Sequence, residues 1–90
     1  MGRINVKIKI MPSSPEVNLK EIEEKTRTAI EENGGKIIRF EEELIAFGLK
    51  AVIVFFIWPE EKELEPLESI LEKIENVSSE QVLDMRKTIG

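Results

Sequence analysis

The side chains that could carry chemistry in this chain are carboxylates, ammonium groups and guanidinium groups, because its 90 residues include no cysteine and no histidine. Without them there are no disulfides, no thiolate chemistry and none of the common zinc sites. The side chain most used for acid–base catalysis near neutral pH is missing as well. Carboxylates alone make a weak case for an enzyme, so we do not expect one.

Glu41, Glu42 and Glu43 form a run of carboxylates, the ligand type that magnesium and calcium prefer. Successive side chains of an extended chain point to opposite sides, so three in a row do not converge on one ion. We therefore interpret the run as a solvated arm of a hairpin and expect no metal there.

The chain has a formal net charge of −5 but contains two groups of cationic side chains. Arg3, Lys7 and Lys9 could face RNA on an open sheet, but their strand lacks the aromatic residues of RNA-recognition folds. An acidic domain is also a poor candidate for binding a phosphate backbone, so we expect no direct nucleic-acid contact. Arg86 and Lys87 either form a solvated tail or offer a cation to a phosphate or to a metal's position.

Phe47 and Gly48 occupy a turn, 45–48, that precedes the apolar run AVIVFFIW at 51–58. Gly48 would let the backbone bend where a Cβ would clash. Phe47 is either an aromatic wedge at a protein interface or a turn residue that folds back on the core. The apolar run is too short to span a membrane and is typical of a strand inside a sheet.

Hydrophobic periodicity gives the elements that position these residues. Asn18 is the expected N-cap of the first helix, and Asn33-Gly34-Gly35 ends it. The predicted elements are strand 3–10, helix 19–32, strand 36–44, strand 51–58, helix 64–75 and strand 78–87.

This order predicts an α+β fold of the ferredoxin-like βαββαβ type. Right-handed crossovers place both helices on one face of a four-stranded antiparallel sheet with strand order 4-1-3-2. The length fits a single domain over residues 1–90. The first residues alternate instead of forming an apolar signal, so we expect a cytoplasmic protein without a membrane segment.

The strand at 51–58 has no polar face. One phase turns Leu49, Ala51, Ile53, Phe55 and Ile57 toward the helices and leaves Val52, Val54, Phe56 and Trp58 outside, and the opposite phase exchanges the two sets. Either way the open face carries an apolar stripe flanked by Lys7 and Lys9. That stripe is either a contact surface or is covered by loops or by the C-terminal tail.

Three stretches of the chain resemble the archaeal elongation factor 1-beta family, which is similar to the exchange domain of the eukaryotic factor. They are Met11-Pro12-Ser13-Ser14-Pro15, the turn Ile45-Ala46-Phe47-Gly48-Leu49-Lys50, and the end from Val77 to Lys87. The resemblance implies a ferredoxin-like fold and guanine-nucleotide exchange on the GTPase elongation factor 1-alpha. It implies no cofactor and no covalent chemistry.

The same resemblance assigns residues to the partner contact. Phe47, next to Gly48, would push into the GTPase, and Lys87 would reach the magnesium site and disturb the ion. The chain departs from the family at Leu44, where relatives commonly have proline, and in continuing past Lys87, which keeps Arg86 as an alternative.

Two other functions fit the fold. One is a regulatory module that binds a small ligand and self-associates through the open sheet face, although a monomer is favoured. The other, an acylphosphatase-like hydrolase, needs an arginine in a phosphate-binding loop after the first strand, and the segment 11–15 has none.

Overall fold

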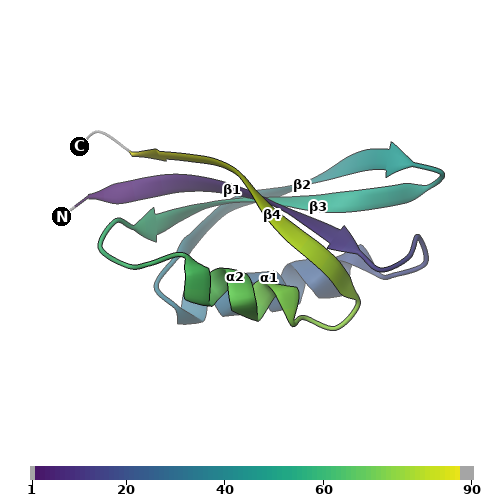
Figure 1. Ribbon diagram of the computed structural model, residues 1–90, viewed down its shortest axis with the longest axis horizontal. Helices are drawn as coiled ribbons and strands as arrows, with labels where there is room; N and C mark the ends of the chain where they lie inside the picture. The colour runs from purple at the N-terminus through teal and green to yellow at the C-terminus, as the bar shows by residue number, and fades with distance from the viewer. Residues whose placement is uncertain (1, 88–90) are drawn as a thin grey trace.

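Six elements follow one another in the computed structural model, which describes residues 2–87. They are β1 (Arg3–Pro12), α1 (Leu19–Glu32), β2 (Lys36–Ala46), β3 (Leu49–Pro59), α2 (Glu65–Glu72) and β4 (Val77–Lys87). The strands pair antiparallel in the order β2-β3-β1-β4, which is the predicted order counted from the other edge. Both helices cover the same face of the sheet, as predicted (Figure 1).

Local sequence signals set both ends of α1. The Asn18 side chain accepts a hydrogen bond from the Lys20 N–H at 3.0 Å, which caps the first turn. At the other end Gly34 takes a φ of +94°, a left-handed conformation that glycine adopts without a steric penalty. The predicted bounds of this helix are confirmed.

The core lies between the sheet and the two helices. The alternation predicted for β1 is confirmed, because Val6, Ile8 and Ile10 are almost fully buried. On β3 the residues opposite them face the same way, since cross-strand partners share one face of a sheet. The core side of β3 consists of Val52, Val54, Phe56 and Trp58, each at most 1% exposed. The phase that leaves these residues outside is therefore wrong, and they do not form an exposed stripe.

Charged side chains of the neighbouring strands cover part of the helix-free face of β3. Ala51 is 0% and Ile53 4% exposed, although no helix lies over them. The Arg39 guanidinium lies 3.8 Å from the centre of the Phe55 ring, and the Lys7 ammonium lies 5.3 Å from it. Long cationic side chains can bury apolar surface along their stems while their charged ends stay in water. Side chains of the neighbouring strands therefore cover Phe55, and cover of the rest of this face by loops or by the C-terminal tail stays a prediction.

The remaining differences from the predicted elements concern their ends. Strands β1 and β2 continue to Pro12 and Ala46, whereas α2 ends three residues early, at Glu72. The chain leaves α2 through tight turns, and Asn76 has a φ of +71°, which redirects it into β4. Ile70, on α2, is 40% exposed and does not belong to the buried core.

Candidate functional site

The β2–β3 hairpin presents Phe47 to solvent at one end of the molecule. The loop is only Phe47 and Gly48, shorter than the predicted turn at 45–48. Their φ angles are +52° and +81°, the sign that a two-residue type I′ turn requires at both positions. The relative exposure of Phe47 is 102%, so this side chain does not fold back on the core. A Cβ at Gly48 would meet nothing within 4 Å, so this glycine serves the positive φ and does not relieve a clash.

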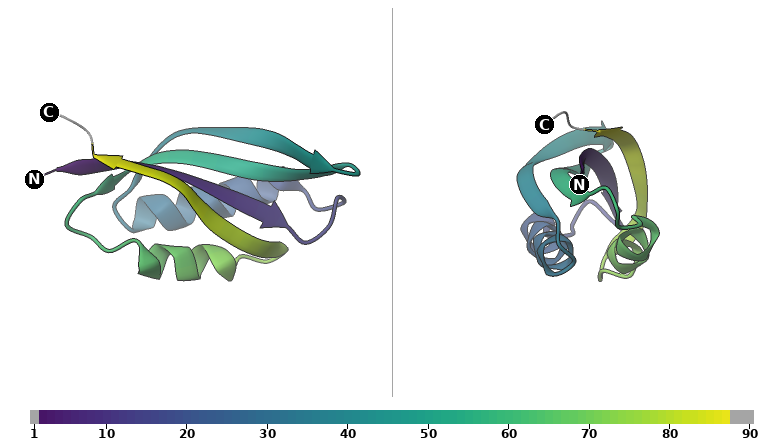
Figure 2. Two further views of the ribbon diagram at one scale, coloured as in Figure 1. Left: turned by 45° about the horizontal axis from the view of Figure 1, so that its top comes forward. Right: turned by 90° about the vertical axis from the view of Figure 1, so that its left-hand side faces the viewer.

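The hairpin extends beyond both helices (Figure 2). Its three glutamates are paired with separate cations, as their alternation predicts: Glu41 with Arg39, Glu42 with Lys50 and Glu43 with Lys9. Within residues 2–87 no cluster of acidic side chains is arranged to hold a metal ion.

Lys87 lies at the opposite end of the sheet, where the start of β1 and the end of β4 pair (Figure 1). Its backbone is opposite Ile4, and its side chain is 76% exposed. The Lys87 ammonium lies 2.5 Å from a carboxylate oxygen of Glu60. The hydrogen bond and the negative charge of Glu60 raise the pKa of Lys87 above its ordinary value, so the side chain remains a cation.

Arg86 has a different environment from Lys87. It lies opposite Asn5, and consecutive residues of a strand point to opposite faces. Arg86 is therefore on the helix-free side, whereas Lys87 is on the side of Ile4. The Arg86 guanidinium is 3.0 Å from the Asp84 carboxylate. The structure thus separates the two cations that the sequence left as alternatives.

Glu60 was not among the residues that the sequence singled out, and its contact with Lys87 was missed. The Glu60 N–H donates to the Gly2 carbonyl at 3.0 Å, which fixes the loop to the start of β1. Two residues on, the Lys62 carbonyl accepts a hydrogen bond from the Trp58 indole at 3.1 Å. The Lys62 ammonium also donates to the Asn33 carbonyl at the end of α1. The strand order places the loop after β3 and the end of β4 on the two sides of the start of β1, but it does not show that a side chain bridges them.

Phe47 and Lys87 are far apart. They lie at the two ends of β3, whose 11 residues span roughly 35 Å at the rise of an extended strand. The longest extent of the molecule is 42 Å. The candidate site is therefore two separate contact points and not one pocket.

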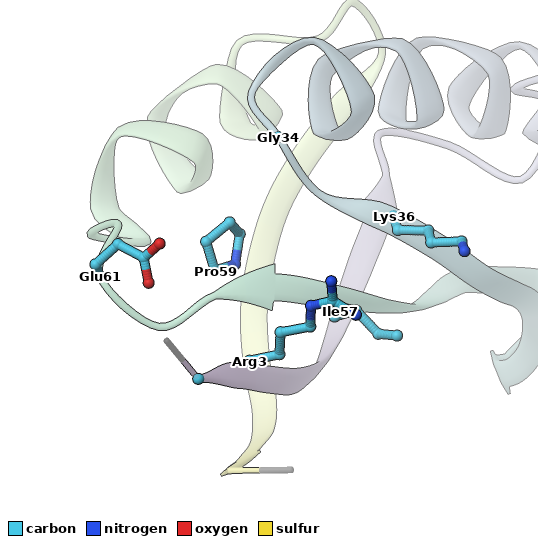
Figure 3. A pocket seen from close by; sticks show the side chains of 7 residues that line it. Arg3, Gly34, Lys36, Ile57, Pro59 and Glu61 are labelled. Carbon is cyan, nitrogen blue, oxygen red and sulfur yellow. The ribbon is translucent and has the colours of Figure 1, made fainter. Parts of the chain in front are cut away.

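A shallow hollow of about 670 Å³ lies near the Lys87 end, lined by Gly2, Arg3, Gly34, Lys36, Ile57, Pro59 and Glu61 (Figure 3). Lys36 extends away from Pro59 and Glu61, so the charged groups do not converge on one point. This geometry does not favour the small-ligand module. No helix in residues 2–87 has the length and hydropathy needed to cross a membrane.

A four-stranded antiparallel sheet with two helices on one face defines a ferredoxin-like protein, here with an exposed phenylalanine at one end and an exposed lysine at the other. Residues 5–88 match the EF-1 guanine nucleotide exchange domain. The chain belongs to this family, as its sequence resemblance implied. It is a nucleotide exchange factor of translation elongation and not an enzyme.

Related proteins match this chain along nearly its whole length. Elongation factor 1-beta of Methanosarcina acetivorans is 44% identical over 85 residues, which cover 93% of this chain and 96% of that protein. The Methanococcus maripaludis strain S2 protein of the same name is 36% identical over 87 residues, with coverages of 94% and 97%. Among solved structures, the C-terminal domain of MgtC from Mycobacterium tuberculosis superposes with a TM-score of 0.64, covering 98% of this chain and 88% of that one. At 10% identity it supports the fold alone.

Proposed function

We propose that this chain accelerates GDP release from elongation factor 1-alpha, with Lys87 acting at the magnesium site and Phe47 holding a second part of the GTPase. The observation that carries the proposal is the family match over residues 5–88. Two features of the fold support the roles of the residues: Phe47 is fully exposed at a hairpin tip, and Lys87 is an exposed cation at the other end.

The chemistry needed at the lysine end is electrostatic. Magnesium in a GTPase bridges the nucleotide phosphates to the protein and neutralises their charge. An ammonium placed among the ligands of the ion competes with it and disturbs their geometry, so the nucleotide loses part of its binding energy. By linkage, exchange factor and nucleotide weaken each other's binding, and no proton transfer or nucleophile is required.

Lys87 suits this role better than Arg86. An ammonium is a compact point charge on a flexible stem, whereas guanidinium is planar and broad. Arg86 is also engaged by Asp84 on the helix-free side of the sheet. Within residues 2–87, Lys87 pairs with the Glu60 carboxylate, and three-quarters of its side chain is exposed.

Phe47 suits the anchoring role. Aromatic side chains contribute a large share of the binding energy at protein interfaces, often about 2 kcal/mol or more each. Because Phe47 is already exposed, docking it removes apolar surface from water without first breaking a contact with the core. A GTPase touched at both ends must extend along the length of the sheet. We expect the chain to act as a single cytoplasmic domain and, when unbound, as a monomer.

The test is release of a fluorescent GDP analogue from the cognate elongation factor 1-alpha. We expect the wild-type protein to accelerate release strongly and Lys87→Met to lower kcat/KM about ten-fold or more. Arg86→Met removes the neighbouring cation and is the matched control, expected to retain most activity. Loss of activity in Arg86→Met with retention in Lys87→Met would move the role to Arg86, and no acceleration by folded wild-type protein would overturn the proposal.

A further inference from the structure

Glu60 and Lys87 are brought together by strands that flank β1 on its two sides. Ile4 pairs with Trp58 on β3 and with Lys87 on β4, so the loop after β3 must reach across the start of β1 to touch Lys87. Gly2 lies in that path. A Cβ at this position would overlap the second carboxylate oxygen of Glu60, so glycine leaves room for the carboxylate there.

We propose that Glu60 holds Lys87 in the unbound protein and thereby lowers its apparent affinity for the GTPase. This inference rests on the proposed function, since it concerns the lysine that acts at the magnesium site. Glu60 is a positioning residue. It acts through Lys87 and does not itself need to touch the nucleotide.

The loop that carries Glu60 is fixed in place, so the position of its carboxylate does not depend on Lys87. The backbone of Glu60 is fixed by its hydrogen bond to Gly2, and the same loop is tied to the end of α1 through Lys62. The Glu60 side chain is 35% exposed and that of Lys87 76%, so the lysine is the more accessible partner. Lys87 must leave Glu60 before its ammonium can enter a site on another protein.

The size of the effect follows from the populations. When only a fraction of the free protein has the binding-competent arrangement, the apparent dissociation constant rises by the inverse of that fraction. Exposed ion pairs are weak, so we expect Glu60 to raise the half-saturating concentration about two- to five-fold. Once the complex has formed, Lys87 has left Glu60, so the maximal rate of GDP release is unaffected.

Glu60→Gln removes the charge and nearly keeps the shape of the side chain. We expect this variant to reach half-saturation at an exchange-factor concentration about two- to five-fold lower, with an unchanged maximal rate. Glu61→Gln is the matched control, because it makes the same charge change one residue away and should leave both values as in the wild type. Gly2→Ala keeps the charge and displaces the carboxylate, so it should shift half-saturation in the same direction as Glu60→Gln.

Two further measurements separate the possible failures. In a Lys87→Met background, Glu60→Gln should have no effect, because its influence passes through the lysine. The NMR titration of the Lys87 ammonium should give a lower pKa in Glu60→Gln than in the wild type. An unchanged lysine titration, or a raised half-saturating concentration, would overturn the role of Glu60. If Glu60→Gln lowers the pKa of Lys87 but Lys87→Met leaves the exchange activity unchanged, the proposed function is overturned. The contact between Glu60 and Lys87 is then still supported.

Discussion

At the scale of single residues, Phe47 combines two features that oppose folding. It is a bulky residue at a φ of +52°, where side chains other than those of Gly, Asn and Asp are strained. It also leaves its whole ring in water. Neither feature contributes to the stability of the hairpin, which Asn-Gly would form with less strain. The residue type at this position is better explained by a contact with another molecule than by the fold.

Phe47→Asn should therefore separate folding from exchange. We expect the free energy of unfolding to stay the same or rise by about 0.5–1 kcal/mol, because asparagine tolerates the left-handed conformation. For a chain of this size such a gain corresponds to a Tm increase of a few degrees. Exchange activity should fall, since the anchor is lost. Thermal unfolding and GDP release measure the two effects, and a variant that loses stability and activity together would contradict the separation.

At the scale of the elements, the sequence predicts the position of β3 but not which of its two faces turns toward the helices. The helices, the strands and their order were predictable, because β1 alternates, α1 is capped and the second half repeats the plan of the first. A strand that is apolar at every position carries no such signal. Its phase is set by pairing with β1, which places Trp58 opposite Ile4 and Val54 opposite Ile8. Only long-range register, not local pattern, supplies that information.

The packing of α2 on β4 creates one unusual carboxyl group. Glu80 lies opposite Ile10, on the helix-facing side of β4, where its Oε2 atom is buried and its carboxyl group lies close to that of Glu68. Partial burial raises the pKa of Glu80 from 4.5 to about 7, and the carboxyl groups of Glu68 and Glu72 on α2 add to the increase. Close to neutral pH the helix and the strand therefore repel each other slightly.

This environment makes stability depend on pH. A carboxyl group with a raised pKa binds its proton more tightly in the folded state, so its contribution is complete below pH 4.5 and is lost as the pH rises to about 7. Glu80→Gln should remove that dependence and stabilise the protein at pH 8 by about 1 kcal/mol, a value lowered for screening by solvent. Urea unfolding at several pH values measures it. Glu16→Gln, an exposed change of the same kind, is the control, and parallel pH profiles for wild type and Glu80→Gln would contradict the assignment.

At the scale of the whole molecule, the strand order places the two contact points apart. Since β3 starts at the hairpin and both β3 and β4 end beside the start of β1, Phe47 and Lys87 must lie at opposite ends of the sheet. That separation was available from the predicted strand order. The contact of Lys87 with Glu60 was not, because it depends on a missing side chain at Gly2 and on how far a loop reaches across β1.

The separation also predicts how the two residues combine in exchange. Substitutions more than about 10 Å apart with no shared partner usually add in free energy, to within about 0.5 kcal/mol. Phe47 and Lys87 are separated by the length of β3 and have no common neighbour among the described contacts. The loss of log kcat/KM in Phe47→Asn/Lys87→Met should therefore equal the sum of the two single losses.

Additivity tests whether each end of the sheet holds its own part of the GTPase. Phe47 could instead only orient the complex so that Lys87 can enter the magnesium site. In that case, removing Phe47 would cause no further loss of exchange activity once the lysine is absent. The double variant would then match Lys87→Met. If the ends bind independently, the aromatic contact still contributes affinity without the lysine, so Phe47→Asn weakens binding of Lys87→Met as much as it weakens binding of the wild type. Titration of each variant against the GDP-bound GTPase, with binding and GDP release measured on the same samples, distinguishes the two arrangements.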